Sequence, residues 1–413
     1  IGLIVPNIVS LYKGDNVGEN IGHTALFGAL FVLVCDILSR IIIYPYELSV
    51  GLTVGVLGSV YSLVWYLGGL DMELNAKLNR EKEENKNINK KNNKESDAKN
   101  KILILGILIL IVSGLFLSIG LNANNMDYAL SQRIPKLLSI ILTGVCISIS
   151  TTIFQTITGN KILTPNVMGL DSLYVLIQTV IVFVLGSSSV FIVNKKYNFI
   201  ICVGGMILLS SLLYKMMFKK ENSNILFLLL VGMIGGTLFS SLSSFMQMVI
   251  DPNEYLVLQN KLFASFNNVN VDILLISIIL IILVIPFVCD DLKYLDVINL
   301  GRDQAINLGI DYDKLVRKLF VTVSIFISIS TALVGPITFL GLLVVNLSRQ
   351  MITTYKHKYL ISMSVLLSVF ILVTGQLLAE RIFNFSTPVS VIINLIGGIY
   401  FMYLLLKESR IWF

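Results

Sequence analysis

The feature that most constrains this chain is a series of long uncharged apolar segments. Residues 102–121, ILILGILILIVSGLFLSIGL, contain no charged side chain. A helix of this length, rising about 1.5 Å per residue, crosses a hydrocarbon layer of about 30 Å. Because lipid offers the backbone no hydrogen-bond partner, such segments are predicted to be helices. Comparable segments occupy 137–160, 172–194, 225–250, 273–289, 319–348, 359–379 and 382–406.

The composition supports a membrane protein and offers little chemistry for catalysis. Only 14% of the residues are charged, against about a quarter in ordinary soluble domains, and the mean hydropathy is +0.83. His23 and His357 lie in short polar segments without a cluster of possible ligands, so no metal site or other cofactor is predicted. The cysteines lack CxxC spacing and are expected to be packing residues. They are Cys35, Cys146, Cys202 and Cys289.

The beginning of the chain repeats part of its end. Shifted by 339 residues, GLIVPN at Gly2 aligns with GLLVVN at Gly341, and the agreement continues without a gap to Gly58 and Gly397. Internal repetition changes what counts as a domain. Residues 1–70 are therefore expected to be the C-terminal remnant of a first unit. Because the chain begins with Ile rather than Met, it is expected to be part of a longer protein.

A charged segment separates the two units. Residues 71–101 contain no aromatic side chain and mix both charge signs with many Asn residues, which is typical of a solvated linker. The segment 102–413 is predicted to be a complete unit, and Gly335 and Pro336 divide its longest apolar run into two helices. Its ten predicted helices are 102–121, 134–157, 167–193, 198–218, 225–250, 272–289, 315–334, 336–350, 359–380 and 388–406; the remnant adds three, near 1–12, 22–43 and 48–67.

The distribution of Lys and Arg predicts the orientation of these helices. Cytoplasmic loops of membrane proteins carry an excess of both residues. Placing the linker in the cytoplasm puts most of the 31 basic residues on that side, together with the C-terminus. The net charge of +6 reflects this asymmetry and is no sign of nucleic-acid binding. The basic residues expected outside are Arg40, Arg133, Lys136, Lys195, Lys196, Lys261 and Arg381.

The longest predicted cytoplasmic loop of the complete unit is a candidate docking element for a soluble partner. Its sequence, 290–318, has too few apolar residues to cross a membrane but enough to form two short helices, broken at Gly301 and ended at Gly309. The pattern alone fits an ordinary interfacial connector equally well. Its apolar residues include Leu295, Ile298, Leu300, Ala305 and Leu308.

Several motifs in a shared order resemble one family. INLGRDQAINLGI at 298–310 followed by GPITFLGLLVVNLSR at 335–349 is similar to the coupling loop and following helices of iron-siderophore and vitamin-B12 ABC importer permeases, the FecCD family. RIPK at 133–136 and FQTITGNKILTPNVMG at 154–169 extend the resemblance over the complete unit. In the remnant, GLIVPNIV, DILSR and YELSVGLTVGVLGSVYSL resemble the end of the same family.

The resemblance implies an all-α polytopic membrane protein with the ten-transmembrane-helix vitamin-B12-type ABC permease fold, plus three helices of a truncated second copy. The copies have diverged, since the family's Val-Pro-His reads Val5-Pro6-Asn7 in one and Val344-Val345-Asn346 in the other. This divergence is expected of two permeases that pair as a heterodimer. The chain thus resembles two adjacent permeases fused through a cytoplasmic linker.

The resemblance also implies roles for particular residues. The loop containing Leu295, Ile298, Leu300, Gly301, Arg302, Ala305, Leu308 and Gly309 would dock on a separate ATPase subunit. Basic residues on the outer surface would receive acidic residues of a substrate-binding lipoprotein, because exposed charges steer encounter and orientation. The alternative is that these cations are ordinary interfacial anchors. The candidate docking cations are Arg133, Lys136, Arg381 and Arg40.

A few polar residues interrupt the predicted spans. Such residues either line a path or bond between helices, and interhelical bonding is expected for most of them. Asp36 and Arg40 are four residues apart and could pair, whereas Asp171 and Glu380 lie near helix ends. The candidate path or interhelix residues are Gln155, Gln178, Gln247 and Gln376.

The leading hypothesis is a permease that is no enzyme and moves ferric siderophore, of catecholate type, across the cell membrane. No GxxxxGK[ST] motif occurs, so ATP hydrolysis must come from a separate subunit. Its expected partners are ATPase subunits, a substrate-binding lipoprotein, a second permease and membrane lipid. Cobalamin or haem is the alternative cargo. An ion-coupled secondary transporter would need charged or broken helices at the midplane, and a lipid-modifying enzyme would need converging His, Asp or Ser residues.

Overall fold

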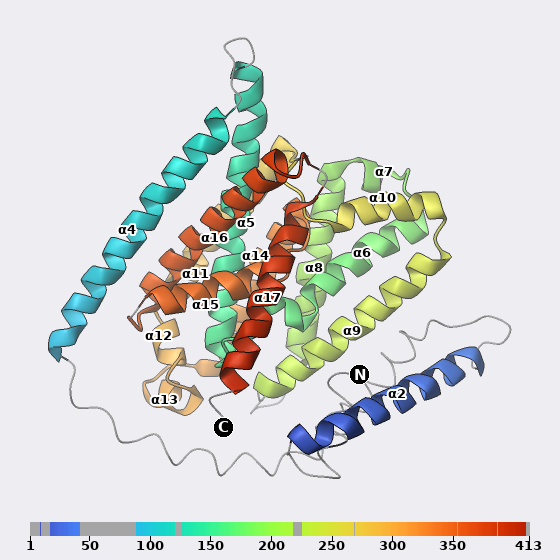
Figure 1. The fold of residues 1–413 in the computed structure, drawn as a ribbon, viewed down its shortest axis with the longest axis horizontal. Helices are drawn as coiled ribbons and strands as arrows, with labels where there is room; N and C mark the ends of the chain where they lie inside the picture. Colours follow the sequence, from blue (N-terminus) through green and yellow to red (C-terminus); the bar gives the residue numbers. More distant parts are fainter. Residues whose placement is uncertain are drawn as a thin grey trace.

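The computed structural model describes residue 9 and residues 17–41, 88–119, 126–217, 225–267, 269–352, 354–385 and 387–409. These residues form helices joined by short connections, with no strand among them (Figure 1). The elements are α2 (Val17–Ile41), α4 (Ile88–Ser118), α5 (Met126–Thr158), η2 (Pro165–Met168), α6 (Leu170–Leu185), α7 (Val190–Val193), α8 (Lys195–Met217), α9 (Ile225–Val249), α10 (Pro252–Leu262), α11 (Val271–Leu292), α12 (Leu295–Ile298), α13 (Arg302–Asn307), α14 (Tyr312–Val334), α15 (Leu340–Met351), α16 (His357–Arg381) and α17 (Val389–Ser409).

Seven of the described helices are long and apolar enough to cross a membrane. Helices α5, α14 and α16 are the most buried of these and form the centre of the bundle, where α5 packs against both α14 and α16. One hydrophobic core joins α4, α5, α15, α16 and α17, and a second joins α5, α6, α12, α13 and α14. The candidate spans lie at 22–40, 95–118, 126–158, 229–249, 271–288, 312–334 and 357–381.

The repeated motif at Gly341 has a packing role in α15. A Cβ atom on Gly341 would collide with the side chain of Thr151 in α5, so this position requires glycine. Five residues further along α15, the Asn346 Nδ2 atom donates to the Lys161 carbonyl at 2.8 Å and holds the α5–α6 connection in place. The Gly of GLLVVN is thus explained by the contact of α15 with α5, and the Asn by the contact of α15 with the α5–α6 connection.

Several predicted helices differ from the observed ones: α5 begins at Met126 instead of residue 134, and α10 has no predicted counterpart. Helix α4 begins at Ile88 instead of residue 102, because the end of the linker is stabilised by an Asp97–Lys101 pair and by a contact between Glu95 and Lys356, at 2.7 Å each. The predicted helix 167–193 is divided at Gly186, whose φ of 76° ends α6. The predicted helix 336–350 begins only at Leu340, after the turn at Pro336.

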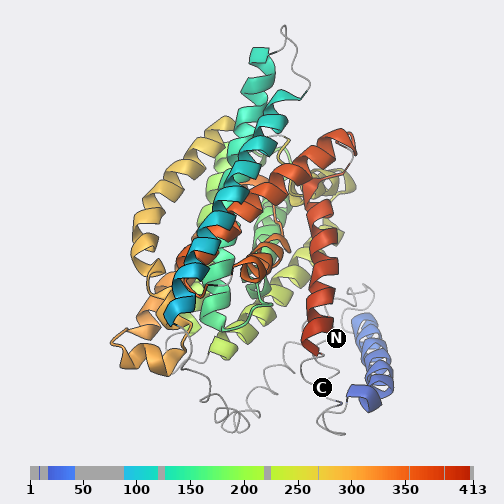
Figure 2. The same cartoon turned by 60° about the vertical axis from the view of Figure 1, so that its left-hand side comes forward.

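The predicted remnant is described only in part. Its expected helix at 22–43 corresponds to α2, which lies beside the bundle in Figures 1 and 2 and exposes large apolar side chains. The expected helices near 1–12 and 48–67 lie outside the described residues, apart from Val9.

The bundle itself has two ends. Helices α12 and α13 lie at one end, the loop end, and α5 begins and α16 ends at the opposite end (Figure 1). Arg133 lies near the beginning of α5, and Arg381 is the last residue of α16.

Candidate functional site

The 290–318 segment folds as two short helices on the loop end of the bundle. Helix α12 ends before Gly301, whose φ of 102° suits glycine, and α13 ends before Gly309, whose φ is 85°. These are the two breaks that the sequence predicts. Arg302 at the start of α13 pairs with Asp313 at 3.0 Å and so joins the loop to the first turn of α14.

The apolar side chains of this loop divide into a buried base and an exposed face. Leu295, Ile298 and Ala305 are at most 2% exposed and belong to the core that contains α5 and α14. Leu300 and Leu308 are 53% and 63% exposed and, together with Ile306, point away from that core. The base fixes the loop on the bundle, while the exposed face is available to another protein.

His357 lies at the junction of the loop with the bundle, a position that no motif in the sequence predicts. The His357 backbone N–H donates to Asp296 Oδ1 at 2.8 Å, and its Nδ1 atom lies 2.6 Å from the same oxygen. Its Nε2 atom lies 2.9 Å from the Thr156 hydroxyl at the end of α5. The adjacent Lys356 has its pKa raised by the hydrogen bond to the Glu95 carboxylate. Four elements therefore meet at the start of α16.

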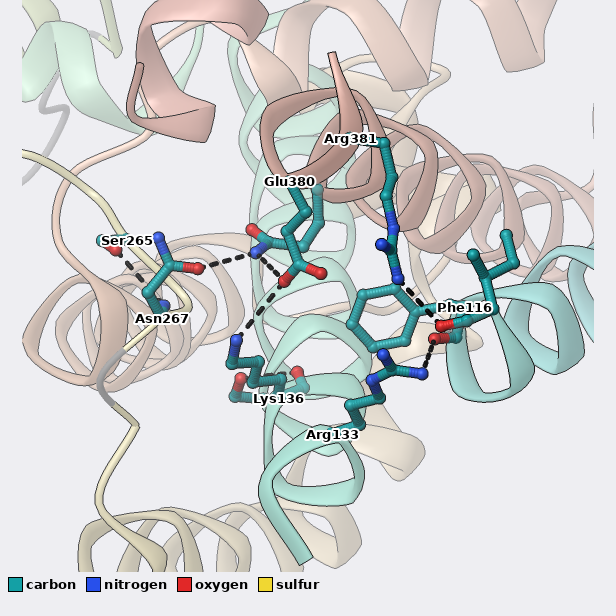
Figure 3. Close-up of polar contacts among 10 residues, drawn as sticks. Phe116, Arg133, Lys136, Ser265, Asn267, Glu380 and Arg381 are labelled. Carbon is teal, nitrogen blue, oxygen red and sulfur yellow. Dashed lines mark hydrogen bonds and ion pairs between the residues drawn. The ribbon is translucent and has the colours of Figure 1, made fainter. Parts of the chain in front are cut away.

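Two of the predicted docking cations bond to the carboxyl end of α4. The Arg133 guanidinium donates to the Leu117 carbonyl at 2.7 Å, and the Arg381 guanidinium donates to the Ile119 carbonyl at 2.8 Å (Figure 3). The last carbonyls of a helix lack partners inside the helix and carry partial negative charge. Both arginines thus stabilise this end of α4, although the Arg381 side chain remains exposed.

Lys136, the third of these cations, belongs to a buried polar chain. Its ammonium lies 3.3 Å from the Glu380 carboxylate, and the two side chains are only 15% and 10% exposed. The Gln376 amide donates to Glu380 at 2.7 Å and to Asn267 at 2.8 Å, which extends the chain from α5 through α16 to the α10–α11 connection (Figure 3). Lys136 also lies over the Phe385 ring, 5.6 Å from its centre. This cation faces the bundle interior.

The fourth predicted cation, Arg40, lies on α2 and pairs with Asp36 one turn earlier at 3.1 Å. Both side chains are substantially exposed, as expected of a local surface pair. Arg40 therefore forms a local pair within its own helix.

The four predicted polar residues of the spans all form hydrogen bonds. Gln178 of α6 bonds to Asn198 of α8 at 2.8 Å, and Gln247 of α9 bonds to Thr179 of α6 at 3.1 Å. Gln155 bonds at 2.7 Å to the Lys161 carbonyl just beyond its own helix. Bonding between helices is thus observed for Gln178 and Gln247, and between a helix and a connection for Gln155 and Gln376.

The described residues hold no group of three or more His, Cys, Asp or Glu side chains arranged to bind a metal ion. Cys35, Cys146 and Cys202 are free thiols and are buried, while the side chain of Cys289 lies outside the described part. The candidate site consists of a loop with an exposed apolar face and two polar clusters at opposite ends of the bundle.

The family model that matches this chain is the FecCD transport family, over residues 1–67 and 101–407. The chain belongs to the FecCD transport family. It is 57% identical over 312 residues to the petrobactin import system permease protein YclO of Bacillus subtilis (strain 168), a match that covers 76% of this chain and 98% of YclO. It is also 64% identical over 59 residues to the petrobactin import system permease protein YclN of the same organism, covering 14% of this chain and 19% of YclN.

A solved structure supports the fold of this FecCD chain. An inward-facing metal-chelate type ABC transporter superposes with a TM-score of 0.64 at 23% identity, covering 75% of this chain and 99% of the other. The resemblance to an ABC permease fold, predicted from the motifs, is confirmed. As a FecCD permease, the chain is a transporter subunit and not an enzyme.

Proposed function

We propose that this FecCD chain is the permease of an ABC importer that carries a ferric siderophore across the cell membrane, with ferric petrobactin as the first cargo to test. The observation that carries the proposal is the match to YclO over nearly its full length. The α12–α13 loop supports it, because an exposed apolar face on a rigid base suits the binding of a soluble ATPase. The relatives do not favour the alternative cargoes, cobalamin and haem, because permeases similar to this chain import petrobactin or iron(3+)-hydroxamate.

The proposed topology places the loop end in the cytoplasm. The excess of basic residues in the linker and the loops supports this orientation, and it puts the C-terminus on the same side. Arg133 and Arg381 then lie at the outer surface, where we assign them to docking of a substrate-binding lipoprotein, along with Arg40. Lys136 has a packing role in this scheme because Glu380 already neutralises it inside the bundle.

The proposed organisation is a fusion of two permease units. The family model matches residues 1–67 and 101–407 as separate segments, and these flank the charged linker. In this scheme residues 1–70 belong to a first unit and 102–413 to a second, and the two kinds of unit would pair across the cargo pathway. Exposed apolar residues of α2, such as Leu26 and Leu33, would then pack against the remainder of the first unit.

Co-purification with candidate ATPase subunits tests the proposed function. Leu308→Glu places a carboxylate on the exposed face of the loop and is expected to weaken ATPase recovery by about tenfold or more. Tyr355→Glu is the matched control, because this side chain is 64% exposed at the same end but outside the loop, against 63% for Leu308. Equal recovery of both variants would exclude the loop as the docking element.

The cargo is tested separately by uptake of radioactive iron into cells that carry the chain with its ATPase and binding lipoprotein. Ferric petrobactin is expected to be taken up, and unlabelled cobalamin is not expected to compete. Uptake of a different ferric siderophore would leave the permease assignment intact and change the cargo. Absence of ATPase recruitment together with uptake that depends on an ion gradient would instead support a secondary transporter.

A further inference from the structure

Helix α12 has a polar attachment to the bundle in addition to its apolar base. Leu295 and Ile298 are buried against α5 and α14, but apolar contacts have little directional preference and permit sliding. Asp296, between them, accepts two bonds from one residue of α16, the His357 backbone N–H at 2.8 Å and the ring Nδ1–H at 2.6 Å. Two donors on one carboxylate oxygen fix the position of α12 relative to α16.

The other ring nitrogen of His357 continues the attachment into α5. Its Nε2 atom lies 2.9 Å from Thr156 Oγ1, and that hydroxyl also lies 2.7 Å from the Thr152 carbonyl one turn earlier. The contact survives a change in protonation of the ring. A protonated ring donates from Nε2 to the Thr156 hydroxyl, which keeps its own hydrogen bond to the Thr152 carbonyl, whereas a neutral ring with its hydrogen on Nδ1 accepts from that hydroxyl only when the bond to Thr152 is given up. The link to Asp296 needs only the Nδ1 hydrogen, which both forms have.

The burial of the three residues is graded from the surface to the interior. The Asp296 side chain is 39% exposed, the His357 side chain is 3% exposed and Thr156 is 3% exposed. His357 is therefore a buried polar group whose two nitrogens both have partners, one on α12 and one on α5. Losing either partner would leave a buried nitrogen unsatisfied, so the three elements are held in one arrangement.

We propose that the chain Asp296–His357–Thr156 is the positioning element that transmits displacement of α12 to the membrane helices α5 and α16. The proposal rests on the proposed function, because it assumes that an ATPase moves the loop. None of the three residues lies on the exposed face formed by Leu300, Ile306 and Leu308. Recruitment of the ATPase and transmission of its movement are thus assigned to different side chains of the same loop.

The test is the amount of ferric siderophore taken up per ATP hydrolysed, in vesicles that contain the full chain, its ATPase and its binding lipoprotein. Asp296→Ala and His357→Ala are expected to retain ATPase recovery within about twofold and to lower this ratio about tenfold. Asp97→Ala is the matched control, since the Asp97 side chain is 46% exposed, against 39% for Asp296, and lies on α4 at the same end but outside the loop. Its ratio is expected to match that of the unmodified chain.

Conservative variants separate transmission from folding. Thr156→Ser keeps the hydroxyl and is expected to keep the ratio, while Thr156→Val removes the hydroxyl at similar size and is expected to lower it. The double variant Asp296→Ala/His357→Ala is expected to be no worse than either single one, because the residues act as one unit.

Three results would overturn the inference. An unchanged ratio in Asp296→Ala would show that the bonds carry no movement, and loss of ATPase recovery in that variant would assign Asp296 to docking. A ratio lowered equally by Thr156→Ser and Thr156→Val would show that packing, not the hydroxyl, is responsible. Failure of the unmodified chain to recruit an ATPase would refute the proposed function itself, and is seen before any variant is compared.

Discussion

The two ends of the bundle use residues of the same predicted role in opposite ways. At the loop end, Leu300 and Leu308 are exposed and have no part in the core beneath them. At the opposite end, Arg133 and Lys136 point to acceptors within the chain, the Leu117 carbonyl and the Glu380 carboxylate. The chemical type of a residue near a helix end therefore predicts at which end of the bundle it lies. It does not predict whether its side chain is free to contact a partner or already bonded within the chain.

The largest expected effect comes from the buried ion pair at the opposite end. Lys136→Ala leaves the Glu380 carboxylate, which is 10% exposed, without its cation, and is expected to lower the free energy of unfolding by about 3–5 kcal/mol. Thermal unfolding in detergent measures the change. The double variant Lys136→Met/Glu380→Gln is the control, because it removes both charges and is expected to recover most of the loss.

If Lys136→Ala kept full thermal stability and weakened only the binding of the lipoprotein, the proposed difference between the two ends would be wrong. Lys136 would then be a docking residue after all, and the buried pair with Glu380 would contribute little. A loss of stability that the double variant does not recover would place the importance of Lys136 in its aliphatic packing instead.

Within the loop end, the base and the exposed face are expected to respond differently to the same truncation. Leu295→Ala empties a fully buried position and is expected to cost about 2–5 kcal/mol of stability. Leu308→Ala removes a side chain that is 63% exposed and is expected to change stability by no more than about 0.5 kcal/mol, while weakening ATPase binding. Unfolding midpoints and ATPase recovery, measured on both variants, separate the two roles. Similar losses of stability would contradict the division into base and face.

The apolar segments and the glycines of the loop were the predictable part of this structure. A run without charges has to be a helix in lipid, and glycine supplies the positive φ at which α12 and α13 end. The start of α4 at Ile88 was not predictable from composition, because the polar end of the linker is stabilised by the contact of Glu95 with Lys356, far away in the sequence.

The two polar clusters were also not predictable from the sequence, because their partners lie far apart along the chain. Glu380 is 244 residues from Lys136, and Asp296 is 61 residues from His357, so no local pattern joins them. His357 stood in a short polar segment with no ligand cluster in sequence, yet folding buries it between three elements. A histidine directly before an apolar span was the one available signal, and it does not identify the partner.

The smallest expected effect concerns the arginines that bond to the end of α4. Arg133→Gln and Arg381→Gln each remove a charged donor from the last carbonyls of α4, and each is expected to cost about 0.3–1 kcal/mol because these contacts are partly or fully exposed. Amide hydrogen exchange near the end of α4 is expected to rise in both variants, with overall unfolding little changed. The rate of association with the lipoprotein distinguishes the two arginines. Because Arg381 is the more exposed of the two, its loss is expected to slow association more than the loss of Arg133. Equal association rates for both variants and the unmodified chain would mean that these cations serve the bundle alone.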